Sequence, residues 1–208
     1  MLKHVVTAVC VDNGEPTLEQ CIQSLRNQTE RVKVVVATGP KTDAELVKSL
    51  ADEVIGPFDR IGVARIAAIL KHGDDIIISC DADSIYDPHY AEYALEDLRG
   101  SNSVKAGSIY PLPGHHYLEA IIEPNLLFFM PYEFSLAFKR SLILSRLPSG
   151  WEQASPRWDI GILTIPFMID NRMRVWTRLP TYYGTRIIAG VKLAGVGAAA
   201  ALPLLLIK

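Results

Sequence analysis

Two aspartates separated by one residue, Asp81 and Asp83, follow directly after the apolar run 76–78. Successive side chains of a strand point to opposite faces, so the two carboxylates point the same way if the chain stays extended through Ala82. Neighbouring carboxylates repel each other unless a cation lies beside them, and their hard oxygens suit Mg²⁺ or Mn²⁺. The motif therefore predicts a divalent-metal site, although a lone D-x-D is more often an acidic turn after a strand.

The composition is that of an ordered globular chain with little attraction for polyanions. Of the 208 residues, 49% are hydrophobic and 21% are charged, which argues against a disordered or low-complexity chain. The formal net charge is −2 and no run of five basic residues occurs, so nucleic acid is not an expected partner. The three cysteines form no C-x-x-C pattern and no Cys/His cluster, so we expect reduced, buried thiols in a cytoplasmic protein.

The first half of the chain alternates strand-like and helix-like segments. Apolar runs predict strands at residues 5–11, 32–37, 54–55 and 76–80. Capping-box patterns predict helices that begin at Thr17 and Thr42, and a third helix is predicted over 61–70. This alternation specifies an α/β fold with a mainly parallel sheet flanked by helices.

In such sheets ligands bind beyond the carboxyl ends of the strands. Asp12, Thr38 and Asp81 each follow or end a predicted strand, so we expect them to meet at one edge of the sheet. The chain has neither a G-x-G-x-x-G after its first strand nor a G-x-x-x-x-G-K-[ST] motif, which argues against dinucleotide and P-loop binding. A phosphate ligand would instead be held through a divalent ion on Asp83.

The second half of the chain is less regular. The pattern predicts a helix over 88–98, a strand over 104–110, a half-buried strand over 134–138 and a helix from Ser141. After a loop at 148–157 it predicts an apolar helix over 160–169 and a late strand over 174–177. No repeat or linker divides the chain, so we expect one domain over 1–180.

Residues 181–208 form an apolar C-terminal tail with an uncharged run of 15 residues, 193–207. About 20 residues are usually needed to cross a bilayer. The tail is therefore a membrane anchor lying in the interface, a short span with a snorkelling Lys192, or a hairpin arm packed on the domain. Membrane association of this tail is favoured. Together with the reduced cysteines, it leads us to expect a cytoplasmic protein or one at the cytoplasmic face of a membrane.

With these elements in order, the chain resembles the family 2 glycosyltransferases of the GT-A fold from about Val5 to Pro180. Four stretches carry the resemblance in the expected order and spacing: VTAVCVDNGEPTLEQCIQSLRNQ, VKVVVATGPKTD, IGVARIAAIL and IIISCDADSIYDP. Two more stretches, FSLAFKRSLI and RWDIGILTIPF, resemble the segments before and around the family's catalytic acid/base. The resemblance implies a nucleotide-binding half over 1–100 and an acceptor half over 101–180.

The resemblance also implies an inverting, metal-dependent hexosyltransferase. It would move a sugar from a nucleotide-diphosphate sugar to a sugar, a polysaccharide or a lipid-linked acceptor, and the polyprenyl-phosphate type is one candidate. Mn²⁺ or Mg²⁺ on Asp83 and Asp81 would neutralise the charge that develops on the leaving diphosphate. The residues that the resemblance places at the nucleotide are Val11, Asp12, Thr38, Arg65 and Asp81.

Two of the implied roles have ordinary alternatives. Asp159 is the candidate catalytic base, but an aspartate in the first turn of a helix is also favourable with the helix dipole, and Glu152 is a reserve base. Arg65 would supply a fixed positive charge near the nucleotide, unless it forms only a surface ion pair.

Two positions depart from the family pattern. Family members commonly carry paired aspartates after the second strand, the latter contacting the base, whereas this chain has Ala37 and Thr38. The nucleotide could then be guanosine- or deoxythymidine-linked, or Thr38 could make a neutral hydrogen bond to the base. The residue before the catalytic aspartate is often acidic in the family, and here it is Trp158.

These departures keep a second kind of function open, a catalytically inactive glycosyltransferase-like binding or scaffold protein. The presence of Asp81, Asp83 and Asp159 argues against it. A nucleotidyltransferase is disfavoured because the loop at 12–16 is acidic instead of rich in glycine and basic residues.

Overall fold

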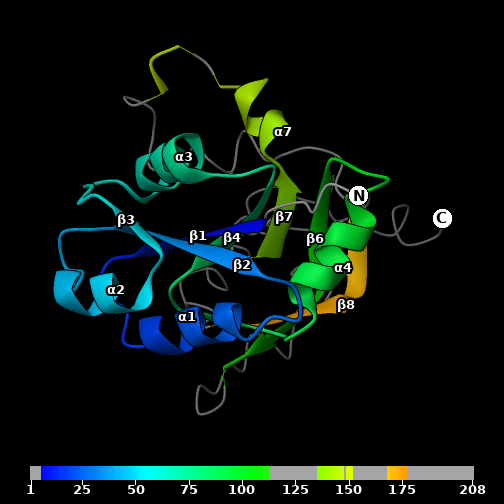
Figure 1. Ribbon diagram of the computed structural model, residues 1–208, viewed down its shortest axis with the longest axis horizontal. Helices are drawn as coiled ribbons and strands as arrows, with labels where there is room; N and C mark the ends of the chain where they lie inside the picture. Colours follow the sequence, from blue (N-terminus) through cyan, green and yellow to red (C-terminus); the bar gives the residue numbers. More distant parts are fainter. Residues whose placement is uncertain (1–5, 113–134, 148, 152–167, 178–208) are drawn as a thin grey trace, which may run out of the picture.

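The computed structural model describes residues 6–112, 135–147, 149–151 and 168–177 (Figure 1). The described strands are β1 (Val6–Asp12), β2 (Val32–Thr38), β3 (Glu53–Ile55), β4 (Ile76–Asp81), β5 (Ser84–Tyr86), β6 (Ser103–Pro111), β7 (Leu136–Lys139) and β8 (Met168–Thr177). The described helices are α1 (Leu18–Arg26), α2 (Ala44–Leu50), α3 (Ile61–His72), α4 (Tyr90–Asp97) and α7 (Arg140–Leu144).

The strands form one sheet in the order β3-β2-β1-β4-β7-β6-β8-β5. Its first half is parallel, because β1 pairs with β2 and β4, and β2 pairs with β3, all in the same direction. In the second half β7 runs antiparallel to β4 and β6, β5 runs antiparallel to β8, and β6 and β8 are parallel. The predicted α/β fold is confirmed, and the sheet as a whole is mixed.

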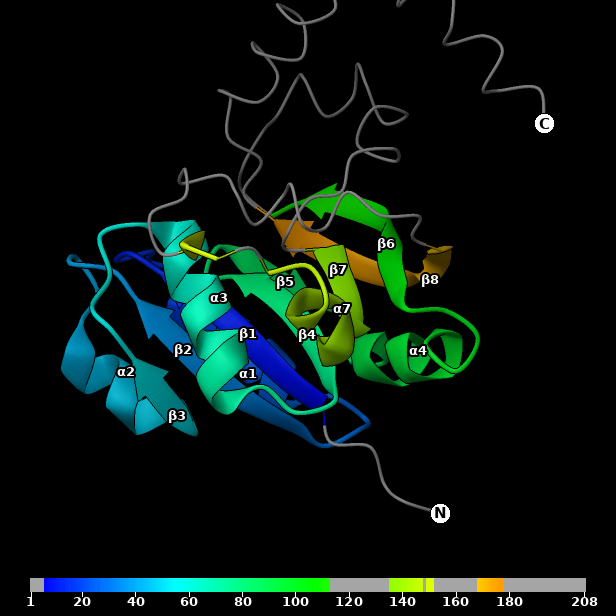
Figure 2. The same ribbon diagram turned by 90° about the horizontal axis from the view of Figure 1, so that it is seen from above.

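Different helices cover the two faces of the sheet. Figure 1 shows α3 above the strands and α1 and α2 below them, and Figure 2 shows α7 beside α3. The lower core holds buried residues of α1 and α4, and the upper core holds buried residues of α3 and α7. In α1 the buried residues are the periodic apolar ones: Leu18, Cys21, Ile22 and Leu25. The helices therefore form where apolar periodicity supplies a face to bury.

The two predicted capping boxes place their helices correctly, but neither threonine side chain makes a capping hydrogen bond, although Thr17 is the N-cap residue of α1. The N-cap of α2 is Asp43, whose side chain accepts two backbone N–H groups. The hydroxyl of Thr42 instead donates to the carbonyl of Asp12 at 2.9 Å. The hydroxyl of Thr17 makes no capping bond and donates to the carbonyl of Ala82 at 3.0 Å. Both threonines thus fasten helix starts to the carboxyl edge of the sheet.

The second half departs from prediction at three places. β7, predicted as half-buried, is a central strand with buried residues facing both cores, because it lies between β4 and β6. β8 begins at Met168, where it pairs with β6, so the helix predicted over 160–169 is wrong at its last two residues. Residues 160–167 lie outside the described ranges. β5 was not predicted, because its three residues directly follow the motif turn and contain no apolar run.

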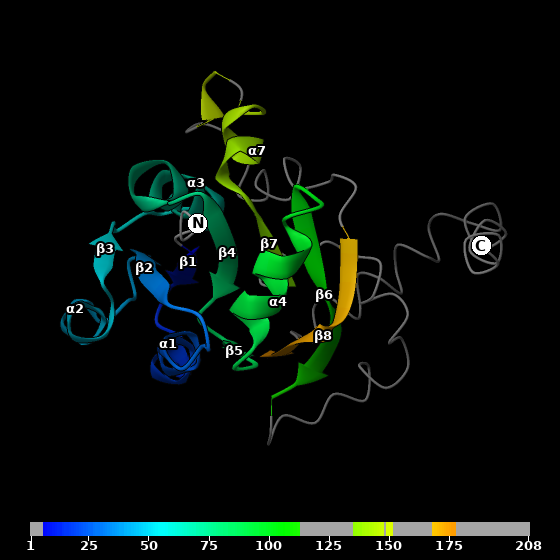
Figure 3. The ribbon, with the colours of Figure 1, turned by 45° about the vertical axis from the view of Figure 1, so that its right-hand side comes forward.

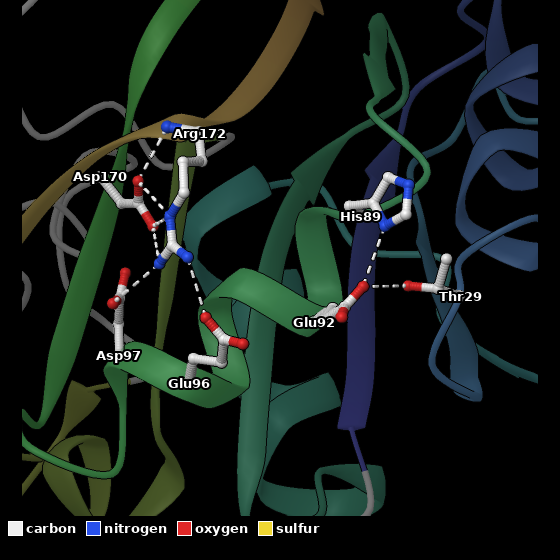
Figure 4. A network of polar contacts seen from close by, with 7 residues as sticks. All are labelled: Thr29, His89, Glu92, Glu96, Asp97, Asp170 and Arg172. Atoms are coloured by element: carbon white, nitrogen blue, oxygen red, sulfur yellow. Dashed lines mark hydrogen bonds and ion pairs between the residues drawn. The ribbon is translucent and has the colours of Figure 1, made fainter.

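The helix α4 lies against β8 (Figure 3), and Arg172 of β8 fastens this helix to the sheet (Figure 4). Its guanidinium donates to Glu96 at 2.9 Å and forms ion pairs with Asp170 at 2.7 Å and Asp97 at 3.4 Å. It also lies 4.6 Å from the ring centroid of Tyr93. A single cation therefore joins two acidic residues of α4 to β8.

Among the described residues, no helix is long and apolar enough to cross a membrane. The predicted tail at 181–208 lies outside those residues.

Candidate active site

Three parallel strands end side by side at one edge of the sheet. Asp12 at the end of β1 pairs with Thr38 at the end of β2, and Val11 pairs with Asp81 at the end of β4. The structure therefore brings together Val11, Asp12, Thr38 and Asp81, as the predicted parallel order requires.

Arg65 of α3 holds Asp81 from within the core. Its side chain is 2% exposed, whereas that of Asp81 is 31% exposed. The guanidinium donates to the Asp81 carboxylate, to the hydroxyl of Ser79 at 2.8 Å and to the carbonyl of Cys80 at 2.9 Å. An arginine keeps its charge in proteins, so the cation here is permanent. Its burial excludes the surface ion pair that the sequence left open.

The D-x-D motif is a turn. β4 ends at Asp81, residues 82 and 83 form the turn, and β5 begins at Ser84. The assumption of an extended chain through Ala82 is therefore wrong. The N–H of Ala82 donates to the carbonyl of Val11 at 3.1 Å, and its own carbonyl accepts the Thr17 hydroxyl. These bonds hold the turn in place. The relative positions of the Asp81 and Asp83 carboxylates therefore depend on the turn and not on the alternation of side chains along a strand.

The three cysteines are free and buried, as predicted. The sulfurs of Cys10 and Cys21 lie 3.8 Å apart, and the Cys21 thiol donates to the carbonyl of Asp81 at 3.5 Å. The thiols therefore pack beneath the motif turn as part of the core.

Asp83 lies in negative surroundings. Its Oδ1 accepts hydrogen bonds from the hydroxyls of Ser84 at 3.3 Å and Thr177 at 3.4 Å. Burial, together with repulsion from Asp81 and Glu15, raises the pKa of Asp83 to about 7. A positive ion beside Asp83 would relieve this repulsion and favour the ionised carboxylate.

The chemistry of Asp81 and Asp83 fits a divalent metal shared with a ligand. Among the described residues, no group of three or more His, Cys, Asp or Glu side chains is placed to hold a metal ion. Mg²⁺, however, is usually bound by one or two carboxylates together with substrate phosphates and water. The two aspartates would supply the protein's share of such a site.

Asp12 shapes the loop between β1 and α1. It is 1% exposed, and its carboxylate accepts the N–H groups of Gly14 at 3.0 Å and Glu15 at 2.9 Å. Gly14 has a φ of +87°, and a Cβ there would lie 2.7 Å from the carbonyl of Lys41. The loop therefore requires glycine at this position, and Asp12 holds its form.

A pocket of about 120 Å³ lies at the ends of β1 and β2. Its apolar lining is Val11, Pro40, Phe58, Ile61 and Ala64, and its other lining residues are Asp12, Asn13, Thr38, Gly39 and Asp59. Pockets that enclose a whole ligand usually measure roughly 300–1,000 Å³. This one has the size for a single flat ring, with the rest of a ligand outside it.

Thr38 faces this pocket as an acceptor. Its hydroxyl donates to the carbonyl of Ile55 at 3.2 Å, and its carbonyl accepts the N–H of Phe58 at 2.8 Å. Gly56 makes this close approach possible, since its φ is +125° and a Cβ would lie 2.7 Å from the Thr38 carbonyl oxygen. The loop from β3 to α3 thereby closes one side of the pocket.

Sequence reasoning missed several residues at this edge. Ser84 directly follows the motif, so its nearness to Asp83 could have been foreseen. Thr177 reaches Asp83 only through the pairing of β5 with β8, and no local signal marks it. Phe58 and Asp59 belong to a loop without a recognisable motif. The predicted base Asp159, the reserve base Glu152 and Trp158 lie outside the described residues.

Comparison with known proteins assigns the family. Residues 6–129, more than half of the chain, match the model of glycosyl transferase family 2. The chain therefore belongs to glycosyl transferase family 2. Among curated proteins, no sequence matches this chain.

Solved structures share the fold. S. aureus TarS has a TM-score of 0.61 at 11% identity over 89% of this chain and 39% of TarS. S. aureus TarS 1-349 with UDP-GlcNAc has a TM-score of 0.60 at 12% identity, covering 85% of this chain and 59% of that one. The mannosyltransferase PcManGT from Pyrobaculum calidifontis, in complex with GDP-Man and Mn²⁺, has a TM-score of 0.58 at 16% identity, covering 86% and 58%. This chain thus spans between about two fifths and three fifths of those proteins, and the likeness is one of fold.

Proposed function

We propose that this protein transfers a sugar from a nucleotide-diphosphate sugar to an acceptor, with inversion at the anomeric carbon and with a divalent cation at Asp81 and Asp83. The observation that carries the proposal is the place of the half-buried Asp83, beside Asp81 and at the carboxyl edge of the sheet. Membership of glycosyl transferase family 2 supports it. So do the ligands named for the similar structures, which are UDP, UDP-GlcNAc and GDP-Man with Mn²⁺.

In this proposal the donor lies along the edge of the sheet. The base occupies the ring-sized pocket at the ends of β1 and β2, and the diphosphate reaches the D-x-D turn. Mn²⁺ or Mg²⁺, when bound, neutralises charge on the leaving diphosphate. Arg65 holds Asp81 in place, and Thr177 and Ser84 hold Asp83, so both carboxylates are oriented before a ligand arrives.

The acceptor is proposed to bind at the second half of the chain. For an acceptor hydroxyl, Asp159 would take the proton from the face opposite the leaving group. A lipid phosphate of the polyprenyl type is the acceptor that the apolar tail at 181–208 favours, because the tail would hold the protein at the cytoplasmic face of a membrane. Arg178, Arg186 and Lys192 would then lie near lipid phosphates.

Isothermal titration of UDP, GDP and dTDP into the full chain with Mn²⁺ tests the donor site. At least one nucleotide should bind, and EDTA should weaken that binding at least 10-fold. Asp83→Asn should weaken it to a similar extent. The matched control is Asp75→Asn, an exposed carboxyl that precedes β4 at the opposite edge of the sheet. If no nucleotide binds to the folded protein in the presence of Mn²⁺, the proposal is wrong.

Turnover separates an enzyme from a binding protein. The nucleotide that binds determines which nucleotide sugars should be tested as donors. Release of the nucleoside diphosphate from these sugars can then be measured in the presence of candidate acceptors. Metal-dependent release that disappears in Asp83→Asn supports catalysis. Binding without any release would favour the inactive scaffold.

A further inference from the structure

The polar side chains of the ring-sized pocket are mainly hydrogen-bond acceptors. The hydrogen of the Thr38 hydroxyl is directed to the carbonyl of Ile55, so the hydroxyl oxygen can only accept from a ligand. Asp59 is exposed at the pocket, and an ionised carboxylate only accepts. The N–H of Gly39 is not available to a ligand, because it donates to the carbonyl of Asp12 at 2.7 Å.

Backbone hydrogen bonds place the two acceptors together. The N–H of Phe58 donates to the carbonyl of Thr38 at 2.8 Å, and Asp59 is the next residue along the chain. Asn13 adds a donor to the same lining, because its Oδ1 already accepts the N–H of Lys41 at 3.3 Å and its amide NH₂ remains. The lining therefore offers acceptors from Thr38 and Asp59 and one amide donor from Asn13.

Nucleobases differ in how many donors they show to such a lining. Uracil and thymine have one ring N–H between two carbonyl oxygens, so they offer a carboxylate a single donor that meets only one of its oxygens. Cytosine and adenine have one amino group beside an unprotonated ring nitrogen. Guanine alone of these has a ring N–H and an amino group side by side, which matches the two oxygens of a carboxylate, and its carbonyl lies next to them to meet an amide donor.

We propose that Asp59 reads the base and selects a guanine nucleoside diphosphate. The inference rests on the proposed function, since it takes the pocket to hold the base of the donor. Asp59, on the loop between β3 and α3, adds a carboxylate to the pocket lining, and its two oxygens match the two adjacent donors of guanine. The apolar side chains of Phe58 and Ile61 lie in the same lining and would cover the ring.

Titration calorimetry of the full chain with Mn²⁺ tests this directly, with GDP, inosine diphosphate, UDP and dTDP as probes. Inosine diphosphate lacks only the amino group of guanine. GDP should bind roughly 10- to 100-fold more tightly than each of the other three, the range expected for one good bidentate contact to a base. Asp59→Asn should weaken GDP by a similar factor, because the amide replaces one acceptor with a donor and breaks the two-donor contact. It should change the affinity for UDP much less, because uracil offers only one donor.

The control and a second variant separate base reading from loop structure. Asp75→Asn should keep every affinity. Asp59→Ser should also abolish the preference for GDP over inosine diphosphate, and thermal unfolding should show that both Asp59 variants fold, since the side chain is exposed.

Two results would overturn the inference while leaving the proposed function intact. One is UDP or dTDP binding at least as tightly as GDP. The other is an Asp59→Asn variant that weakens all nucleotides alike, which would place the carboxylate at the ribose or in the loop. If no nucleotide binds at all, the proposed function fails and the inference fails with it.

Discussion

The guanidinium of Arg65 is almost fully buried, while the Asp81 carboxylate that it binds remains about one-third exposed at the edge of the sheet. One end of this ion pair is thus fixed in the core by bonds to Ser79 and Cys80, and the other end is open to solvent at the edge of the sheet. A charge-assisted bond of this kind both orients the carboxylate and compensates part of its charge. Asp81 is therefore held in place before any ligand binds.

Arg65→Met should damage both stability and ligand binding. The variant leaves Asp81 without its cation and removes the hydrogen bonds to Ser79 and Cys80, so we expect the free energy of unfolding to fall by roughly 2–4 kcal/mol. Mn²⁺-dependent affinity for the nucleotide diphosphate should fall at least 10-fold, because Asp81 loses its orientation. Urea unfolding and titration calorimetry measure the two effects.

Two further variants serve as comparison. Arg65→Lys should give an intermediate loss, since lysine restores the charge but not the planar fork. Arg31→Met, at an exposed position, should behave as wild type. Wild-type affinity in a folded Arg65→Met protein would show that the orientation of Asp81 does not matter for the ligand.

Thr177→Val should weaken only the contribution of Mn²⁺ to nucleotide binding. Valine has nearly the same shape, but it removes the hydroxyl that bonds Asp83 at 3.4 Å and Ser84 at 2.9 Å. We expect Mn²⁺ to be needed at roughly 3- to 10-fold higher concentration for the same nucleotide binding, which corresponds to about one hydrogen bond. Thr177→Ser should retain most of the affinity. Thr29→Val, which removes an exposed hydroxyl bound to Glu92, should have no effect, and an equal loss there would refute a specific role for Thr177.

Local pattern was sufficient to predict the parallel half of the fold. The apolar runs that form β1, β2 and β4 are long and β-branched, and the helices between them carry clear apolar periodicity. Because parallel strands joined by helices end at the same edge, the meeting of Asp12, Thr38 and Asp81 followed from the order of elements alone.

Long-range pairing decided what the pattern could not. Phe138 and its neighbours alternate like a half-buried strand, but their burial depends on β4 and β6 on either side. The turn at Ala82 is fixed by Val11 and Thr17, which lie far away in the sequence. Thr177 reaches Asp83 across 94 residues. Sequence patterns within one element carry no information about contacts of this kind.

Arg172→Gln should lower stability without changing nucleotide affinity. The cation bridges Glu96 and Asp97 of α4 to Asp170 and lies against Tyr93, so its loss affects several contacts at once. Because the side chain is about half exposed, we expect a modest loss of stability that becomes smaller at high salt.

Urea unfolding in low and high salt measures the effect of Arg172→Gln. Lys48→Gln is the control, since it breaks one exposed pair with Glu45 and should cost less than about 0.5 kcal/mol. If the two variants lost the same free energy of unfolding, the ion pairs of Arg172 with α4 would contribute no more to stability than a single exposed ion pair.

Lys105 should make stability depend on pH in the alkaline range. The side chain is fully buried on β6, and burial lowers its pKa to about 7, from an unfolded value near 10.5. Between these two values the unfolded chain binds a proton that the native protein does not. The free energy of unfolding therefore rises with pH through this window, by at most about 1.4 kcal/mol per pH unit from this residue. Below pH 7 both states are protonated, and the contribution of Lys105 no longer changes.

Comparison with Lys105→Met isolates this contribution, because the other titrating groups act equally in both proteins. The wild type should gain stability relative to the variant as the pH is raised from 7 to about 9.5, measured by urea unfolding at each pH. Lys71→Met, at an exposed position, should keep a constant difference from wild type. A constant difference for Lys105→Met as well would show that Lys105 is charged in the native protein throughout this range, with its charge compensated inside the fold.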